Sequence, residues 1–138
     1  ADLDDGPEQK PLAYDQYKNA FIENLKVRDF DIVITHAPFG EYTRHLRHEE
    51  LSQALSFMLF EGGLSSREVW FFWYSDEGGR ELPSARNDCD LVISLDDEGF
   101  RRKSSLLFDI YGFSRESWAG RAIPRDEGVK IRKDLLKG

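Results

Sequence analysis

All three histidines of the sequence, His36, His45 and His48, lie within thirteen residues of one another. Imidazole is the commonest metal-binding side chain, so this crowding indicates a site whose chemistry would be metal binding. His45 and His48 are three residues apart, which places both side chains on one face if they lie in the first turn of a helix. This spacing also arises by chance, so its meaning depends on the segments that flank it.

The histidines are flanked by a strand pattern and a helix pattern. Residues 31–34 read Asp-Ile-Val-Ile, which is typical of a buried strand, and residues 49–60 carry apolar side chains at helical spacing. Ligands of open α/β sheets bind where strands end and the following helices begin. We therefore expect a site here, with His48 at the head of the buried stripe of the helix, pointing toward the sheet.

Helix and strand patterns alternate along the rest of the chain. Helices are predicted over 12–28, 49–60 and about 97–111, and strands over 31–35, 69–74 and 91–94. The strand runs are apolar without alternation, a pattern typical of parallel strands covered by helices on both faces. We expect 31–35 and 69–74 to be parallel neighbours or near neighbours, the third helix to be capped by Asp96 or Asp97, and residues 114–138 to form a surface-wrapping tail with a short helix near 130–136.

Composition restricts the class of protein. A chain of 138 residues with 40% hydrophobic residues has enough apolar material for one domain. The formal net charge of -7 argues against binding to nucleic acid or to an anionic membrane surface, both of which attract basic proteins. The longest apolar run, residues 69–74, is too short to span a bilayer. We expect a small molecule as the partner, and the composition is also compatible with a homo-oligomer.

The single cysteine, Cys89, excludes an internal disulfide and a zinc cluster built from cysteines. This favours a reduced, cytoplasmic setting. The predicted sheet has few strands, and its first clear element is a helix, so the chain resembles the later part of a larger sheet. We therefore expect exposed apolar residues near the strands.

Residues 31–48 resemble the second metal-site motif of the zinc-dependent PIG-L/LmbE-like N-acetylglucosaminyl deacetylases. The matching residues are Asp31, Val33, Thr35 and His36, then Gly40-Glu41-Tyr42, then His45 and His48. Leu3-x-Asp5-Gly6 also resembles a turn of this family, and most of residues 1–118 follows the family order. The resemblance implies a Rossmann-like three-layer α/β/α fold with a mostly parallel sheet, here lacking its N-terminal strands.

The resemblance implies roles for two histidines. His48 matches a zinc ligand, and His45 matches the catalytic histidine that stabilises the oxyanion or protonates the leaving amine. The remaining polar residues lie beside this site. Glu41 and Tyr42 either bind sugar hydroxyls or are ordinary loop residues. His36 either bonds to the backbone at the strand end or lies at the substrate rim, where Arg44 is a further candidate.

The sequence departs from the family in three places. Thr43-Arg44 replaces the usual Gly between Tyr42 and His45 and is one residue longer. The family's N-terminal His-Pro-Asp-Asp-Glu motif, which supplies two further zinc ligands and the general base, is absent, so we expect a C-terminal portion of such a domain. Leu46-Arg47 replaces the usual Pro-Asp between the histidines, and that Asp orients the catalytic histidine. Glu41 or Glu49 is a candidate substitute.

Two functions remain open from the sequence. One is zinc-dependent hydrolysis of an N-acetyl group on an amino sugar or glycoconjugate. The other is a non-catalytic ligand-binding or interaction domain of the same fold, in which Arg44 and Arg47 hold an anionic group beside an incomplete metal site. With His48 as its one assigned ligand, the chain alone is expected to bind zinc weakly and to be inactive.

Overall fold

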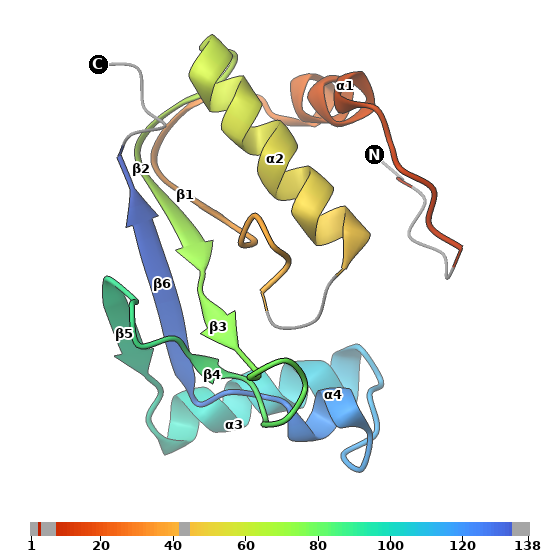
Figure 1. The fold of residues 1–138 in the computed structure, drawn as a ribbon, viewed down its shortest axis with the longest axis vertical. Coiled ribbons are helices and arrows are strands. Elements are labelled where there is room, and N and C mark those ends of the chain that lie inside the picture. Colours follow the sequence, from red (N-terminus) through yellow and green to blue (C-terminus); the bar gives the residue numbers. More distant parts are fainter. Residues whose placement is uncertain (1–2, 4–7, 42–44, 134–138) are drawn as a thin grey trace. The chain divides into compact units, whose positions relative to one another are not determined.

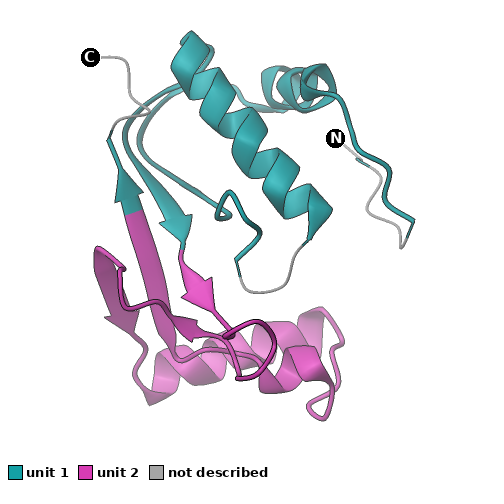
Figure 2. Cartoon of the chain, in the orientation of Figure 1, with its two compact units in different colours: residues 1–72, 131–138 teal, residues 73–130 magenta. Residues whose placement is uncertain are grey.

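The computed structural model describes Leu3, residues 8–41 and residues 45–133, which form two compact units (Figures 1 and 2). Unit 1 contains the residues up to Phe72 together with those from Ile131 onward, and unit 2 contains Trp73–Lys130. The one domain expected from the length of the chain is thus divided into two units. No helix in the described part of the chain has the length and apolarity needed to cross a membrane.

Unit 1 is built around a strand–helix–strand segment with one more helix before it (Figure 1). Strands β1 and β2 pair in parallel, with Val33 opposite Val69 and Thr35 opposite Phe71. This confirms that the two apolar runs are parallel neighbours joined through a helix. The elements of unit 1 are α1 (Tyr14–Asn24), β1 (Asp29–Thr35), α2 (Leu46–Glu61) and β2 (Ser65–Phe72).

Helix α2 lies over one face of the β1–β2 pair (Figure 1). Its buried apolar side chains and those of β2 form much of the core of unit 1: Ala54, Leu55, Met58, Leu59, Val69 and Phe71. On β1, Ile32 and Ile34 are 43% and 56% exposed. The expectation of exposed apolar residues near the strands is confirmed, and the expectation that helices cover both faces of the pair is wrong.

Unit 2 contains antiparallel strand pairs and the remaining helices. Strand β3 pairs with β4, and β5 pairs with β6, both in antiparallel orientation. The predicted cap is confirmed, because the Asp96 side chain accepts a hydrogen bond from the Gly99 backbone at 2.7 Å. The elements are β3 (Tyr74–Ser75), β4 (Ser84–Ala85), β5 (Leu91–Ser94), α3 (Asp97–Ser105), a π-helix (Leu106–Ile110), α4 (Trp118–Arg121) and β6 (Asp126–Arg132), whose last two residues belong to unit 1.

The prediction of a Rossmann-like, mostly parallel sheet is wrong. The four-stranded sheet has the order β1-β2-β6-β5, and β1–β2 is its only parallel pair among the described residues. The prediction assumed that a helix between two strands returns the chain for parallel pairing. The connection from β5 to β6 contains helices, yet these strands are antiparallel.

Two further expectations differ from the structure. Residues 114–138, expected to wrap the surface, include α4 and β6, and Lys130–Arg132 are strand rather than helix. The apolar residues Leu106, Ile110 and Tyr111 of the predicted helix over about 97–111 favour an inward face, but these residues are 54%, 74% and 74% exposed. The π-helical turn at 106–110 interrupts the 3.6-residue period on which that inward face was predicted.

A buried polar network joins α2 to α1 and to the segment before it. Arg47, which is 7% exposed, donates to the Glu50 carboxylate and, at 2.8 Å, to the backbone oxygen of Lys10. The Tyr17 hydroxyl donates to the same carboxylate at 2.8 Å, and the Leu12 backbone N–H donates to it at 3.0 Å. Burial and the hydrogen bond to Glu50 raise the pKa of Tyr17 to about 12, so this hydroxyl remains a donor. The network fixes the residue that precedes His48.

The two tyrosines of α1 offer a matched test of this network. Tyr17 donates to Glu50 from a 3% exposed position, whereas Tyr14 donates to Glu61 at 3.0 Å in an exposed setting. We expect Tyr17→Phe to lower the free energy of unfolding by about 1.5–3 kcal/mol, because a buried hydrogen bond to a charged group is lost. Tyr14→Phe should lower it by less than about 1 kcal/mol. Urea denaturation of both variants measures the difference, and equal losses would contradict a stabilising role of the network.

Candidate metal centre

The site begins where β1 ends. His36 directly follows Thr35, the last residue of β1, and is itself half-buried. Thr35 and Ala37 on either side of it are 7% and 0% exposed, so their burial fixes the backbone that carries the imidazole. The sequence predicted that His36 lies at the site, because ligands of open α/β sheets bind beside the carboxyl ends of the strands.

The loop after His36 reverses the chain through left-handed backbone. The Gly40 N–H donates to the Ala37 carbonyl at 3.0 Å, and Gly40 and Glu41 have φ angles of 78° and 65°. A Cβ on Gly40 would lie 3.2 Å from both the Glu49 Cγ and the His45 backbone nitrogen, so only glycine fits there without displacement. Glu41 adopts the same left-handed backbone conformation although it is not a glycine, and this strain costs about 1–2 kcal/mol. Such strain is concentrated at functional sites, and here it returns a carboxylate to His36.

The other two histidines come from the start of α2. The helix begins at Leu46, so His48 lies in its first turn and His45 is the N-cap residue, with extended φ and ψ of -128° and 113°. His45 is therefore not on the helix as the spacing suggested, although its ring still stacks on that of His48, with centroids 4.3 Å apart. The His48 side chain is 35% exposed and is not part of the buried stripe of α2.

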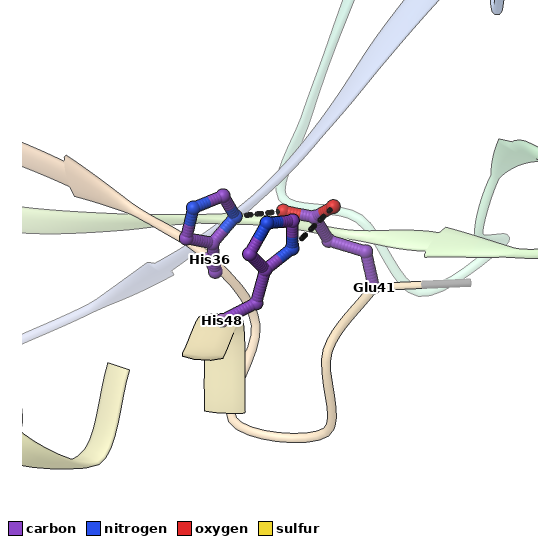
Figure 3. Close-up of side chains that lie close together, drawn as sticks. All are labelled: His36, Glu41 and His48. Carbon is purple, nitrogen blue, oxygen red and sulfur yellow. Dashed lines mark hydrogen bonds and ion pairs between the residues drawn. The ribbon is translucent and has the colours of Figure 1, made fainter. Parts of the chain in front are cut away.

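His36, Glu41 and His48 form a compact group, which we call the His/Glu cluster (Figure 3). The Nδ1 atom of His36 shares a hydrogen bond with Glu41 Oε1, and the Nδ1 atom of His48 lies 3.7 Å from Glu41 Oε2. The rings of His36 and His48 stack with centroids 3.7 Å apart and planes only 8° from parallel. Potential ligand atoms of the three residues all lie within 4.8 Å of one another.

The electrostatics keep the Glu41 carboxyl ionised. Burial raises its pKa, but the hydrogen bond with His36 and the closeness of the His36 and His48 rings outweigh burial and lower the pKa of Glu41 to about 2. The carboxylate is therefore present as an anion near neutral pH. An anionic oxygen beside two imidazole nitrogens is a suitable donor set for a divalent cation.

The donor set fits a catalytic type of zinc site, with one adjustment. Two histidines and one glutamate are a known set of three protein ligands that leaves a further position for water or substrate. A bound metal lies near the plane of each imidazole ligand, and two parallel planes share no point. Because the His36 and His48 rings are nearly parallel, at least one of them must rotate before both can bind the same ion.

The structure brings together three of the six predicted site residues. His48 was assigned as the zinc ligand, and His36 and Glu41, assigned to the substrate or its rim, contribute the other donors of the cluster. His45 contacts the cluster through its ring. Tyr42 and Arg44 lie outside the described residues.

The sequence pattern assigned His36 and Glu41 to the substrate or its rim and did not predict them as candidate metal ligands. A signal for this role was present in the loop, because Pro38 and Gly40 together favour a tight turn that returns residue 41 toward residue 36.

Comparison with known proteins adds no relative: no family model, no curated protein and no solved structure matches the chain.

Two glycines provide a matched test of the loop geometry. Gly40 and Gly112 both have positive φ, 78° and 73°, but a Cβ on Gly112 meets nothing within 4 Å. We expect Gly112→Ala to lower the free energy of unfolding by about 1–2 kcal/mol from backbone strain alone. Gly40→Ala should lower it by about 1–3 kcal/mol more, because Glu49 and the His45 backbone must also move. Urea denaturation measures both losses, and an equal loss in the two variants would show that the loop is not crowded at Gly40.

Proposed function

We propose that the protein binds a divalent cation of the zinc type through the His/Glu cluster and uses it to hydrolyse the N-acetyl group of an amino sugar or glycoconjugate. The observation that carries the proposal is the convergence of two imidazoles and one ionised carboxylate, whose potential ligand atoms lie within 4.8 Å of one another. The two parts of the proposal have different support. The geometry supports the metal centre, and the sequence motif supports the substrate.

Zinc is favoured by the types of donor. Imidazole nitrogen with a single carboxylate suits zinc and related transition metals, whereas calcium and magnesium prefer sites made of oxygen atoms. A zinc ion supplies Lewis acidity toward an amide carbonyl and lowers the pKa of a water molecule bound to it. The protein's part is to keep the Glu41 carboxylate ionised and to hold the two imidazoles beside it.

His45 is assigned a role in the reaction rather than in metal binding. It is not one of the three converging donors, but its ring lies against that of His48. We assign it the role implied by the resemblance, in which it stabilises the developing negative charge or protonates the leaving amine.

The substrate class rests on the motif from Asp31 to His48. The mostly parallel sheet implied by the same resemblance is not present, so the fold adds no support to the choice of an amino sugar. The arrangement of ligands in this proposal also differs from the one the resemblance implied. Here Glu41 and His36 accompany His48, in place of a His and an Asp from an N-terminal motif.

The non-catalytic alternative loses one of its two arginines. It required Arg44 and Arg47 to hold an anionic group, but Arg47 is buried and bonded to Glu50 and to the Lys10 backbone. This removes one of the two anion-binding groups that the alternative needs, and the enzyme remains our proposal. The proposal includes a cytoplasmic location, with which the single cysteine is compatible. The proposed partner is a small amino-sugar substrate, and a homo-oligomer is compatible with the proposal.

Substitution of each donor tests the metal centre. We expect His36→Ala, Glu41→Gln and His48→Ala each to weaken zinc binding by at least about a hundredfold, because each removes one of three ligands and so exceeds the effect of losing an outer hydrogen bond. His45→Ala is the control and should retain most zinc affinity while losing turnover. Isothermal titration calorimetry measures binding, and acetate released from N-acetylglucosamine derivatives measures turnover.

The outcomes separate the two parts of the proposal. Zinc affinity retained by His48→Ala or by Glu41→Gln would exclude the His/Glu cluster as the metal centre. Zinc binding that depends on the cluster, without acetate release from any N-acetylated amino sugar tested, would leave the centre in place and remove the deacetylase assignment.

A further inference from the structure

Ser52 is a buried hydroxyl without an evident structural purpose. Ser52 lies on α2 and is 0% exposed. Its Oγ atom has no hydrogen-bond partner among the described residues. Buried polar side chains nearly always have a partner, so such an exception calls for an explanation. Ser56, one turn further along α2, shows the usual solution: its Oγ donates to the Ser52 carbonyl at 2.8 Å.

The position of Ser52 relates it to His48. The two residues are four apart on α2 and so lie on the same face of the helix, in adjacent turns. Side chains of an α-helix lean toward its N-terminus, and the Ser52 hydroxyl therefore leans toward the turn that carries His48. At helical spacing, His48, four residues before Ser52, and Glu49, three residues before it, are the neighbouring polar side chains in that direction.

Metal binding creates a need for a partner at this place. The nearly parallel rings of His36 and His48 cannot both bind one ion in their ring planes, so one ring must rotate. A histidine bound to a metal through one ring nitrogen usually donates the N–H of its other nitrogen to an oxygen atom, which fixes the ring orientation. Ser52 Oγ is a buried oxygen without a partner among the described residues, one helical turn from His48.

We infer that Ser52 is a positioning residue of the metal-bound state, in which its hydroxyl oxygen accepts a hydrogen bond from the His48 ring nitrogen that does not bind the metal. This inference rests on the proposed metal centre. It explains why a hydroxyl without a partner is kept in the core, because its partner is present only after the His48 ring has turned to bind the ion.

The test compares Ser52→Ala with Ser56→Ala. Ser52→Ala should weaken zinc binding about 10- to 100-fold by calorimetry, the usual effect of losing a hydrogen bond to a metal-bound histidine. Its thermal midpoint without metal should be unchanged or raised, because the variant removes a buried hydroxyl that has no partner. Ser56→Ala removes a satisfied hydroxyl from the same helix and should leave zinc affinity unchanged within about twofold.

A purely structural serine would give the opposite result, with lower stability in the metal-free protein and normal zinc affinity. Normal affinity in Ser52→Ala, or equal weakening in both variants, would overturn the inference while leaving the metal centre intact. Absence of zinc binding by the unaltered protein would overturn both. Proton NMR of the zinc-loaded unaltered protein adds a test that needs no variant: one His48 ring N–H should be protected from exchange, and a rapidly exchanging one would also overturn the inference.

Discussion

The carboxylate of Glu41 holds the imidazoles of His36 and His48 together, and the candidate metal centre depends on this contact. Its two oxygens face one ring nitrogen each, so a single side chain fixes two others that come from a loop and from a helix. The backbone at Glu41 is strained, and the strain is the cost of returning the chain within five residues of His36.

The scaffold supplies rigid supports on both sides of this contact. β1 delivers His36 at its end, and the first turn of α2 delivers His48, while the α2 side chains that point elsewhere anchor the helix. Arg47 is held by Glu50, which also binds Tyr17 of α1. Neighbouring positions on a helix face different directions. Arg47 therefore contacts the α1 side of α2, while His48, the next residue, faces the candidate metal centre.

The sequence predicted those parts of the molecule whose signals are local. The parallel pairing of β1 and β2 followed from two apolar runs joined through a helix, and the Asp96 cap followed from residue type. It did not predict β6, because Asp126–Arg132 is mostly charged and carries only two large apolar residues. Nor did it predict the orientation of β6, since a long connection with helices permits either direction. At the site, the histidines were found from their crowding, but the joint geometry of His36 and Glu41 depends on left-handed backbone that residue types alone only suggest.

X-ray absorption spectroscopy of the zinc-loaded protein measures the ligands of the metal directly. We expect a first shell with two nitrogen ligands at about 2.0–2.1 Å and at least one carboxylate oxygen, with the outer-shell scattering that identifies two imidazole rings. If His36→Ala loses the scattering of one imidazole, the second imidazole ligand of the zinc is His36 and not His45. A shell made only of oxygen atoms, or one that is unchanged in His36→Ala, would contradict the claim that the His/Glu cluster binds the metal.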